Sequence, residues 1–301
     1  MSGESTVATL RQGEQVEGVF ACVRKERLLA RTGNPYLTLE LRDSTGSVLA
    51  RAFNEADLLA GRFERGDIVR VKGKVGSFKE ELQLELTQID RADLPEQELA
   101  RFLPSSRLDM EELEGFLEHL VREIYDPGLR GLCDRLLTDK ALRAQLRRAP
   151  CSLPGQEGPR GGHHHAYLGG LLEHTVAVCS MALELCAVHA RLDRDLLLCA
   201  AVLHDIGKTQ EFSYGAQIER TEQGRMLGHV ELGLRLIGRA APSSLDPRRR
   251  LALEHCVALH HGPDSGSEVR FVSAEAAALY RINALDAHVK GMLERGQGTQ
   301  Q

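Results

Sequence analysis

The sequence has 301 residues, 42% of them hydrophobic and 27% charged, and a formal net charge of −5. This length suits two domains with separate cores, and the negative charge gives no general reason to expect nucleic acid as a partner. No apolar run approaches 18 residues without a charge, so we predict no membrane span.

The N-terminus has no basic segment followed by an apolar stretch, so we expect no signal peptide. The seven cysteines are scattered and form no C-x-x-C pair, which is typical of reduced core residues in a cytoplasmic protein. None of the twelve histidines precedes His119, so the two halves of the chain are expected to do different work.

The first 90 residues show the two-residue alternation of short β-strands. We predict five strands, with a short helix over 55–63 between the third and the fourth. The strands are expected at 14–23, 35–43, 47–53, 68–75 and 81–89. This order is that of an OB-fold barrel, so we predict an all-β domain over residues 1–91.

Details of this region are similar to the nucleic-acid-binding OB-fold family. Asp43-Ser-Thr-Gly46 follows the second strand, the fourth strand reads Gly66-Asp-Ile-Val-Arg-Val-Lys-Gly73, and Leu82-Gln-Leu84 lies in the fifth. The resemblance implies that the barrel binds single-stranded RNA or DNA.

Basic and acidic residues are nearly equal in number in this domain, so a nucleic-acid surface would have to come from local clusters. One cluster is predicted in the first loop and another in the region of strands 4 and 5. The candidates are Arg24, Lys25, Arg27 and Arg31 in the first, and Lys72, Lys74, Phe78 and Lys79 in the second. The alternative is a solvated surface or a barrel that docks another protein.

The remainder of the chain reads as helices. We predict a linker over 92–108, a helical domain over 109–295 and a disordered tail over 296–301. A Gly/Pro-rich mobile loop is predicted at 152–162, and a hairpin or loop at 213–224. The helices are expected at 109–125, 127–148, 167–190, 194–206, 226–240, 247–261 and 273–293.

An apolar helical run over 196–203 ends in His204 and Asp205, followed by Gly207 and Lys208. Burying either of the first two groups unpaired costs several kcal/mol, so a partner is required. A divalent cation would serve, because imidazole and carboxylate both bind zinc, manganese or iron. The alternative is a His–Asp pair that only caps the helix.

Further candidate ligands lie at helix ends or on otherwise apolar helical faces. They are His174, His229, His260, His261 and Asp286. A single buried histidine is more often a satisfied core residue than a ligand. Several isolated polar groups on separate buried helices favour a shared metal centre.

The order of these residues resembles the HD-domain phosphohydrolase superfamily, whose pattern is H…HD…H…HH…D. A closer resemblance is to the YhaM-like 3′-to-5′ exoribonucleases, which join an N-terminal OB fold to an HD domain. It is carried by the segments 102–106, 164–175, 204–208, 227–230, 259–262 and 285–287. The resemblance implies an α-helical HD domain after the barrel.

The resemblance also implies two divalent ions, with manganese favoured and iron, cobalt or magnesium as alternatives. The first would be held by His174, His204 and Asp205, and the second by His229, His260 and His261, with Asp205 between the two. The family has an Asp where this chain has Asn283, and an amide oxygen is a poorer ligand than a carboxylate. Residues 283 and 286 lie roughly 60° apart on a helix, so Asp286 is the candidate substitute.

Metal-activated water at such a site would attack a phosphodiester. Asp205 and Lys208 are the candidate catalytic residues, because Lys208 would stabilise charge on a phosphate oxygen. The alternative for Lys208 is a helix-end cation favoured by the helix dipole.

The leading hypothesis is a metal-dependent 3′-to-5′ exonuclease that acts on single-stranded RNA, or DNA, and releases nucleoside 5′-monophosphates. One alternative is an HD phosphohydrolase of small or cyclic nucleotides with a regulatory barrel. Another is a nucleic-acid-binding protein with a degenerate metal site. We expect a cytoplasmic protein without a membrane partner, and the pattern leaves a homo-oligomer open.

Overall fold

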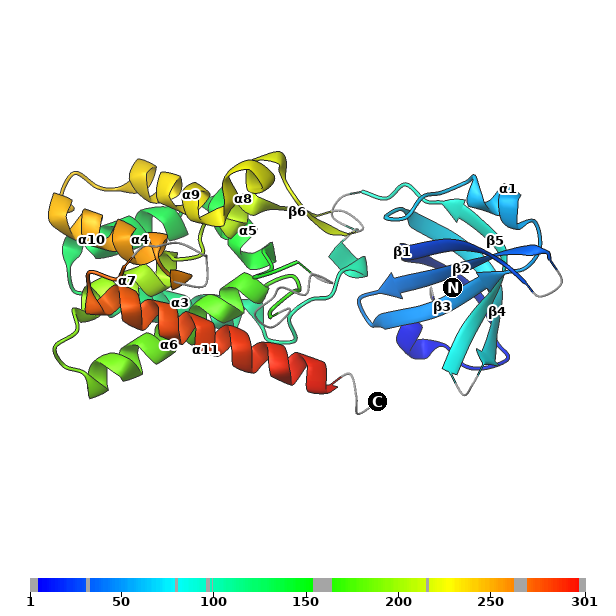
Figure 1. The fold of residues 1–301 in the computed structure, drawn as a ribbon, viewed down its shortest axis with the longest axis horizontal. Helices are drawn as coiled ribbons and strands as arrows, with labels where there is room; N and C mark the ends of the chain where they lie inside the picture. Colours follow the sequence, from blue (N-terminus) through cyan, green and yellow to red (C-terminus); the bar gives the residue numbers. More distant parts are fainter. Residues whose placement is uncertain are drawn as a thin grey trace. The chain divides into compact units, whose positions relative to one another are not determined.

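The computed structural model describes residues 5–30, 33–78, 81–95, 98, 100–153, 164–214, 217–262 and 270–297. The chain divides into two compact units, coloured by sequence in Figure 1. Met1–Pro104 and Tyr214–Glu219 form one, here called the barrel unit, and Ser105–Ser213 and Arg220–Gln301 form the other, the helical unit.

The barrel unit contains five strands that close into a barrel in the order β1-β2-β3-β5-β4. Only the β3–β5 pair is parallel, and the helix α1 (Ala56–Ala60) lies between β3 and β4 in the chain. This arrangement confirms the predicted OB-fold barrel. The strands are β1 (Gln15–Leu29), β2 (Pro35–Asp43), β3 (Gly46–Ala52), β4 (Ile68–Phe78) and β5 (Glu81–Arg91), preceded by the 3₁₀ turn η1 (Val7–Thr9).

The alternation in the sequence is explained by the barrel core. Leu37, Leu39 and Leu41 of β2 all point inwards and are fully buried, so the residues between them lie on the outer face. Asp43 fixes the turn that follows, because its Oδ1 accepts hydrogen bonds from the backbone N–H groups of Thr45 (2.7 Å) and Gly46 (3.2 Å).

The helical unit consists mainly of helices. A short hairpin, in which β6 (Phe212–Tyr214) pairs with β7 (Ile218–Arg220), follows α8 in the chain, and its residues Tyr214–Glu219 belong to the barrel unit. The hairpin lies within the segment predicted as a hairpin or loop. The helices are α3 (Met110–Arg122), α4 (Pro127–Leu137), α5 (Lys140–Arg148), α6 (Gly170–Val188), α7 (Arg194–Leu203), α8 (Lys208–Glu211), α9 (Glu222–Ala240), α10 (Pro247–Ala258) and α11 (Ala274–Gln297).

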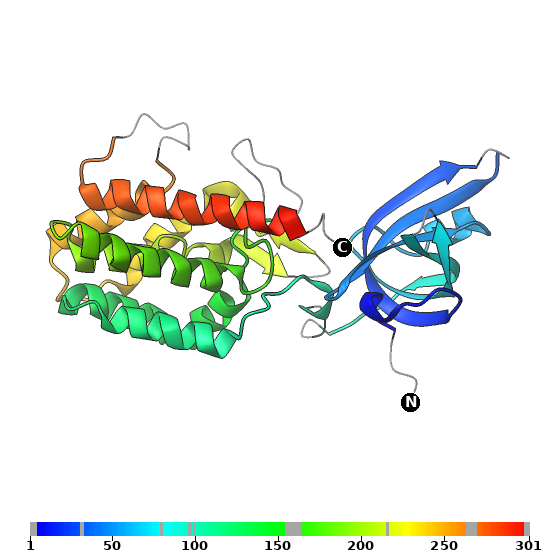
Figure 2. The same cartoon turned by 90° about the horizontal axis from the view of Figure 1, so that it is seen from below.

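The apolar helix α6 lies between α3 and α11, as Figure 2 shows, and also contacts α7. It is the one helix among the described residues that is long and apolar enough to cross a membrane by length and composition. A core helix passes the same test, and Leu171, Leu172 and Val178 of α6 are fully buried in the helical core. The expected absence of a membrane span stays a prediction.

Two predicted helices differ from those observed. The helix predicted over 127–148 is two helices, because the Asp139 carboxylate accepts the Leu142 N–H (2.8 Å) and starts α5 there. In α9 the chain kinks at Gly228, where φ is 71°, so His229 begins a new helical segment.

The predicted linker and tail are only partly described. Within 92–108 the chain forms the 3₁₀ turn η2 (Ala100–Phe102), and Phe102 packs on Val19 and Ile68 of the barrel unit. Helix α11 continues two residues into the predicted tail, whose remaining residues lie outside the described part of the chain. Most of the predicted Gly/Pro-rich loop, 154–162, also lies outside it.

Gly207 allows α9 to approach α8 closely. A Cβ at this position would meet the carbonyl oxygen of His229 at 1.9 Å and the backbone nitrogen of Gly233 at 2.5 Å. Gly207→Ala is therefore expected to lower the free energy of unfolding by about 1–3 kcal/mol, because the backbones must separate. Chemical denaturation measures this loss.

Gly115→Ala is the matched control, because a Cβ there meets nothing within 4 Å. That change in α3 should stabilise the protein by about 0.5–1 kcal/mol. Equal stability changes at the two glycines would mean that the approach of α8 and α9 is not close.

Candidate metal centre and nucleic-acid interface

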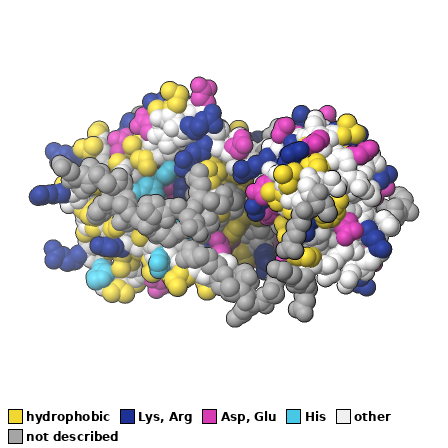
Figure 3. Space-filling view, turned by 45° about the vertical axis from the view of Figure 1, so that its right-hand side comes forward, with side chains coloured by type: hydrophobic (Ala, Val, Ile, Leu, Met, Phe, Trp, Pro, Cys, Tyr) yellow, Lys and Arg dark blue, Asp and Glu magenta, His cyan; other side chains and the backbone are white. Residues whose placement is uncertain are grey.

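The turn between α7 and α8 places three polar side chains in the interior of the helical unit. His204 is the C-cap of α7, Asp205 follows it, and Lys208 opens α8. All three are buried, and His204 is fully so. In Figure 3, histidine side chains (cyan) are visible at the surface of the helical unit, and the His229 side chain is 17% exposed.

Each oxygen of Asp205 faces a different pair of histidines. Its Oδ2 lies 3.7 Å from Nε2 of His174 and 3.4 Å from Nε2 of His204. Its Oδ1 lies 3.4 Å from Nε2 of His229 and 3.3 Å from Nε2 of His260. The first pair was assigned from the sequence to one ion, and the second pair, together with His261, to the other, with Asp205 between them.

The protein fixes the tautomer of these four histidines through their other ring nitrogen. Nδ1 of His204 lies 2.8 Å from the carbonyl oxygen of Ala201, and Nδ1 of His260 lies 2.6 Å from that of Val257. Because a carbonyl oxygen only accepts, each Nδ1 carries the proton and each Nε2 presents a lone pair.

Two further carboxylates fix the remaining pair in the same way. Nδ1 of His174 donates to Asp286 (2.6 Å), and Nδ1 of His229 lies 3.2 Å from Glu211. A ligand histidine that donates its second N–H to a carboxylate or a carbonyl is the usual outer shell of a metal site.

The Nε2 lone pairs of these histidines point into shared spaces, where a cation could bind them. Nε2 of His174 lies 3.1 Å from Nε2 of His204, and Nε2 of His229 lies 2.9 Å from Nε2 of His261. Among the described residues, Oδ1 of Asp205 and Nε2 of His260 are buried without a hydrogen-bond partner. Buried polar atoms are rarely left unpaired, so the donor set fits divalent cations.

The protonation states agree with this interpretation. Burial lowers the pKa of His260 to about 4 and holds that of His261 well below its usual range, so both imidazoles are neutral at pH 7. Burial would raise the pKa of Asp205, but Lys208 and His204 outweigh it and keep that pKa well below its usual range. His174 is the exception, because Cys151 and Asp286 raise its pKa against the effect of burial, so a metal that binds its Nε2 would have to displace a proton.

The Lys208 ammonium is hydrogen-bonded to residues of the metal centre. Its Nζ donates to Oδ2 of Asp205 (2.6 Å) and to Sγ of Cys151 (3.3 Å). These two hydrogen bonds account for its position without any contribution from a helix dipole. Burial opposes its charge, but Asp205 raises the pKa of Lys208.

The two candidate ligands of α11 are hydrogen-bonded to histidines of the centre. Oδ2 of Asp286 accepts from His174 and lies 3.1 Å from Nε2 of His165. Nδ2 of Asn283 donates to the carbonyl oxygen of His260 at 3.3 Å. In this geometry Asp286 orients His174 and Asn283 holds the backbone of His260.

Sequence reasoning missed four residues at this centre: Cys151, His164, His165 and Glu211, which holds Nδ1 of His229. Cys151, His164 and His174 have ligand atoms within 4.8 Å of one another, as do His165, His174 and Asp286. The run of histidines at 163–165 was the available signal, although His163 itself lies outside the described residues. Gly170 permits the approach, because a Cβ there would meet the carbonyl oxygen of His165 at 2.1 Å.

Asp286→Asn is expected to weaken metal binding by about 10- to 100-fold, because it removes the charge that orients His174 while keeping the side-chain shape. Metal titration followed by calorimetry measures the change. Glu275→Gln is the matched control on α11, since its carboxylate accepts from the Asp193 backbone and is in none of the ligand groups. Equal affinities in the two variants would remove Asp286 from the centre.

Three of the basic residues predicted in the first loop of the barrel unit, Arg24, Lys25 and Arg27, lie instead in β1, which extends to Leu29. Arg24 pairs with Glu26 (2.7 Å) and Arg27 with Asp57 (2.5 Å). Lys25 is mostly buried and donates to the carbonyl oxygens of Ala60 and Phe63. Its ammonium group thus has a structural role, which corrects its assignment to an open loop.

The second predicted cluster lies in β4, where Lys72 pairs with Glu17 at 3.0 Å. Lys74 is exposed in the same strand, and Phe78 ends it with half of its surface exposed. Arg31 and Lys79 lie outside the described residues.

A second surface, on the outer face of β2 and β3, was not predicted. The rings of Tyr36 and Phe53 stack with centroids 5.5 Å apart, and the Arg51 guanidinium lies 5.0 Å from the ring centre of Phe78. Among the described residues, Nε of Arg42 and Nε of Arg51 are buried without a hydrogen-bond partner. Figure 3 shows hydrophobic side chains beside Lys and Arg on the barrel. Stacking rings beside cations suit the bases and phosphates of a single strand.

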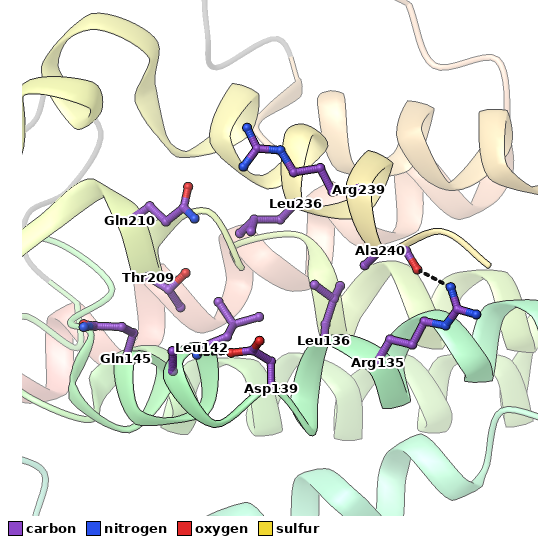
Figure 4. Close-up of a pocket in the computed structure, with 11 residues that line it drawn as sticks. Arg135, Leu136, Asp139, Leu142, Gln145, Thr209, Gln210, Leu236, Arg239 and Ala240 are labelled. Carbon is purple, nitrogen blue, oxygen red and sulfur yellow. Dashed lines mark hydrogen bonds between the residues drawn. The ribbon is translucent and has the colours of Figure 1, made fainter.

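The helical unit also contains a cavity of about 370 Å³, shown in Figure 4. Arg135 crosses its edge and donates to the carbonyl oxygen of Ala240 at 3.4 Å. Thr209 and Gln210, which follow Lys208, also line it, but none of the candidate metal ligands does. The cavity is therefore separate from the metal centre.

Comparison with known families supports both units. Residues 16–91 match the OB-fold nucleic acid binding domain, and residues 171–288 match the HD domain. The second match contains His174, the His204–Asp205 pair and Asp286. HD domains bind divalent metals, and the clusters described above could hold them.

Several solved OB folds are similar to the barrel unit. The second OB-fold domain of replication protein A from Methanococcus maripaludis is 21% identical over 30% of this chain and 96% of its own, with a TM-score of 0.25. A replication protein A heterotrimer bound to ssDNA is 18% identical over 33% and 71%, with a TM-score of 0.24. A mitochondrial single-stranded DNA binding protein from S. cerevisiae is 15% identical over 28% and 99%, with a TM-score of 0.25.

At these values the likeness to solved structures bears on neither activity nor ligand. The family matches, the closed five-stranded barrel and the buried histidine–aspartate cluster agree with one another. The chain joins an N-terminal OB-fold nucleic acid binding domain to a C-terminal HD domain, the domain of metal-dependent phosphohydrolases.

Proposed function

We propose that this protein is a metal-dependent 3′-to-5′ exonuclease that degrades single-stranded RNA and releases nucleoside 5′-monophosphates. The observation that carries the proposal is the Asp205 carboxylate, whose two oxygens face separate pairs of imidazole nitrogens. A carboxylate shared between two histidine sets suits two divalent ions, of which manganese is our first candidate. The aromatic and arginine side chains of the barrel favour a single strand as the substrate.

When bound, divalent ions in such a centre activate water and polarise the phosphoryl group that is attacked. The protein's own contribution is orientation. Asp286 and Glu211 hold the N–H groups of His174 and His229, which keeps both Nε2 lone pairs directed at Asp205. Lys208, beside the same carboxylate, would donate to a non-bridging phosphate oxygen as negative charge develops there.

Single-stranded RNA labelled at its 5′ end tests the reaction, with Mn²⁺, Mg²⁺ or a chelator added to the purified protein. We expect products that shorten one nucleotide at a time from the 3′ end, and 5′-mononucleotides in the same mixture. The chelator should stop both. RNA with a blocked 3′ end should persist, and DNA of the same sequence run in parallel measures the preference for RNA.

Small nucleotides offered beside the RNA separate this proposal from its alternatives. Hydrolysis of a mononucleotide or cyclic dinucleotide with intact RNA would indicate a small-nucleotide phosphohydrolase with a regulatory barrel. Binding of RNA without hydrolysis under any metal would indicate a nucleic-acid-binding protein with a degenerate centre.

A further inference from the structure

Cys151 lies against the metal centre and not in an apolar core. Its Sγ is 3.6 Å from Oδ2 of Asp205, 3.4 Å from Nε2 of His164 and 3.3 Å from Nζ of Lys208. The side chain is 2% exposed. All seven cysteines are described and buried, and Cys151 is the only one that the described residues place in a group of possible metal ligands.

The distance between Cys151 and Asp205 fits an edge of the coordination shell that His174, His204 and Asp205 would form. Ligands bound at about 2.0–2.3 Å in a tetrahedron lie roughly 3.3–3.8 Å from one another. Oδ2 of Asp205 lies 3.7 Å from Nε2 of His174 and 3.4 Å from Nε2 of His204, both within this range, and those two nitrogens are slightly closer, at 3.1 Å. The separation of 3.6 Å between Sγ and Oδ2 belongs to the same range.

The atoms around Sγ are also those that a bound thiolate needs. The ammonium of Lys208 donates to both Sγ and Oδ2 of Asp205, so it stabilises negative charge on each. His164, at 3.4 Å, offers a ring nitrogen to the same sulfur. The Lys208 ammonium thus pairs with both the Cys151 sulfur and the Asp205 carboxylate. Positive charge is therefore favourable beside these two groups.

We infer that Cys151 is a fourth ligand of the ion held by His174, His204 and Asp205, an inference that rests on the metal centre of the proposed function. The sulfur binds as thiolate, and the thiol proton is released to solvent when the metal binds. A thiolate makes this half of the centre softer than the half formed by His229, His260 and His261. At this one ion, zinc, cobalt or ferrous iron is therefore favoured over magnesium and manganese, and manganese stays the first candidate for the ion held by His229, His260 and His261.

Cobalt substitution tests the inference without an activity measurement. The full chain, kept reduced with a phosphine, is loaded with Co²⁺, and its absorption spectrum is recorded. We expect the visible bands of bound Co²⁺ and, in the near ultraviolet, the charge-transfer band of a thiolate bound to cobalt. Cys151→Ala and Cys151→Ser should lose the near-ultraviolet band.

Cys133→Ala is the matched control, because Cys133 is buried in the helical core beside Cys199, at 3.5 Å between the sulfurs. It should keep the full near-ultraviolet band. Cys151→Ser keeps the volume of the side chain, so it provides the test if Cys151→Ala fails to fold. In the folded variant, Zn²⁺ affinity should fall at least about tenfold, and Mn²⁺ affinity should change less.

The outcomes separate this inference from the proposed function. Wild-type protein that binds Co²⁺ without a near-ultraviolet band, or a band that survives in Cys151→Ser, overturns the thiolate ligand and leaves the metal centre standing. Wild-type protein that binds no Co²⁺, Mn²⁺ or Zn²⁺ overturns both.

Discussion

Asp205→Asn is expected to reduce hydrolysis by more than about 100-fold, a larger loss than the change of an outer-shell group causes. The amide keeps the shape of the carboxylate but removes the charge that faces four imidazole nitrogens. It also leaves the buried ammonium of Lys208 without its anionic partner. Initial rates on end-labelled RNA and the metal content of the purified variant measure the two losses together.

The change should act through ligands and not through packing, so the helical circular dichroism of Asp205→Asn should match the wild type. His204→Ala should have the same effect on metal content. Asp134→Asn, on an exposed face of α4 where the carboxylate pairs with Arg130 (3.7 Å), is the matched control and should keep full activity. Wild-type turnover of Asp205→Asn at normal metal loading would remove Asp205 from the mechanism.

The second large effect is expected on the binding of single-stranded nucleic acid by the barrel unit. Replacing both Phe53 and Phe78 with Ala should raise the dissociation constant for a single-stranded oligonucleotide, because each stacked base is worth about 1–3 kcal/mol, or about 5- to 150-fold. Arg51→Ala should in addition reduce the salt dependence of binding by about one phosphate contact. Fluorescence anisotropy at several salt concentrations measures both quantities.

The chemistry should survive these changes, so cleavage of a dinucleotide too short to span the barrel should stay near the wild-type rate. Phe116→Ala is the matched control, because Phe116 is an equally exposed ring on α3 of the helical unit. Unchanged affinity in the double variant, or binding that ignores salt, would favour a barrel that docks another protein.

The sequence alone determined the type of each unit. Alternation over 37–41 identifies a strand with one face inside a barrel, and the Asp43–Gly46 turn closes a hairpin by contacts within four residues. Such features are local, so their period and turn chemistry are readable without the fold. The helix predicted over 127–148 failed where a cap at Asp139, a single side-chain contact, outweighed the helical pattern.

The roles of the charged residues in the barrel unit could not be assigned from the sequence. Arg24, Lys25 and Arg27 are a cluster in the sequence, yet each is paired within the barrel unit with an acidic side chain or with carbonyl oxygens. Arg51, which no sequence cluster marks, lies on the outer face of β3 because it alternates with the buried Ala50 and Ala52, and the exposed Phe53 directly follows the strand. The sequence shows how many charged residues a segment contains. Whether they form a binding surface depends on which side chains and carbonyl oxygens the fold places beside each of them.

At the metal centre the sequence determined which residue types gather, since isolated polar groups on apolar helices require one another. Only the tertiary structure decided their roles. It directs the two oxygens of Asp205 to different histidines, places Asp286 behind His174 and brings Cys151 within 3.6 Å of Asp205. Cys151 and His260 lie 54 and 55 positions from Asp205, and Asp286 lies 112 positions from His174. Whether such a residue is a ligand or an outer-shell group depends on a few ångströms and on which ring nitrogen is held, and spacing along the chain encodes neither.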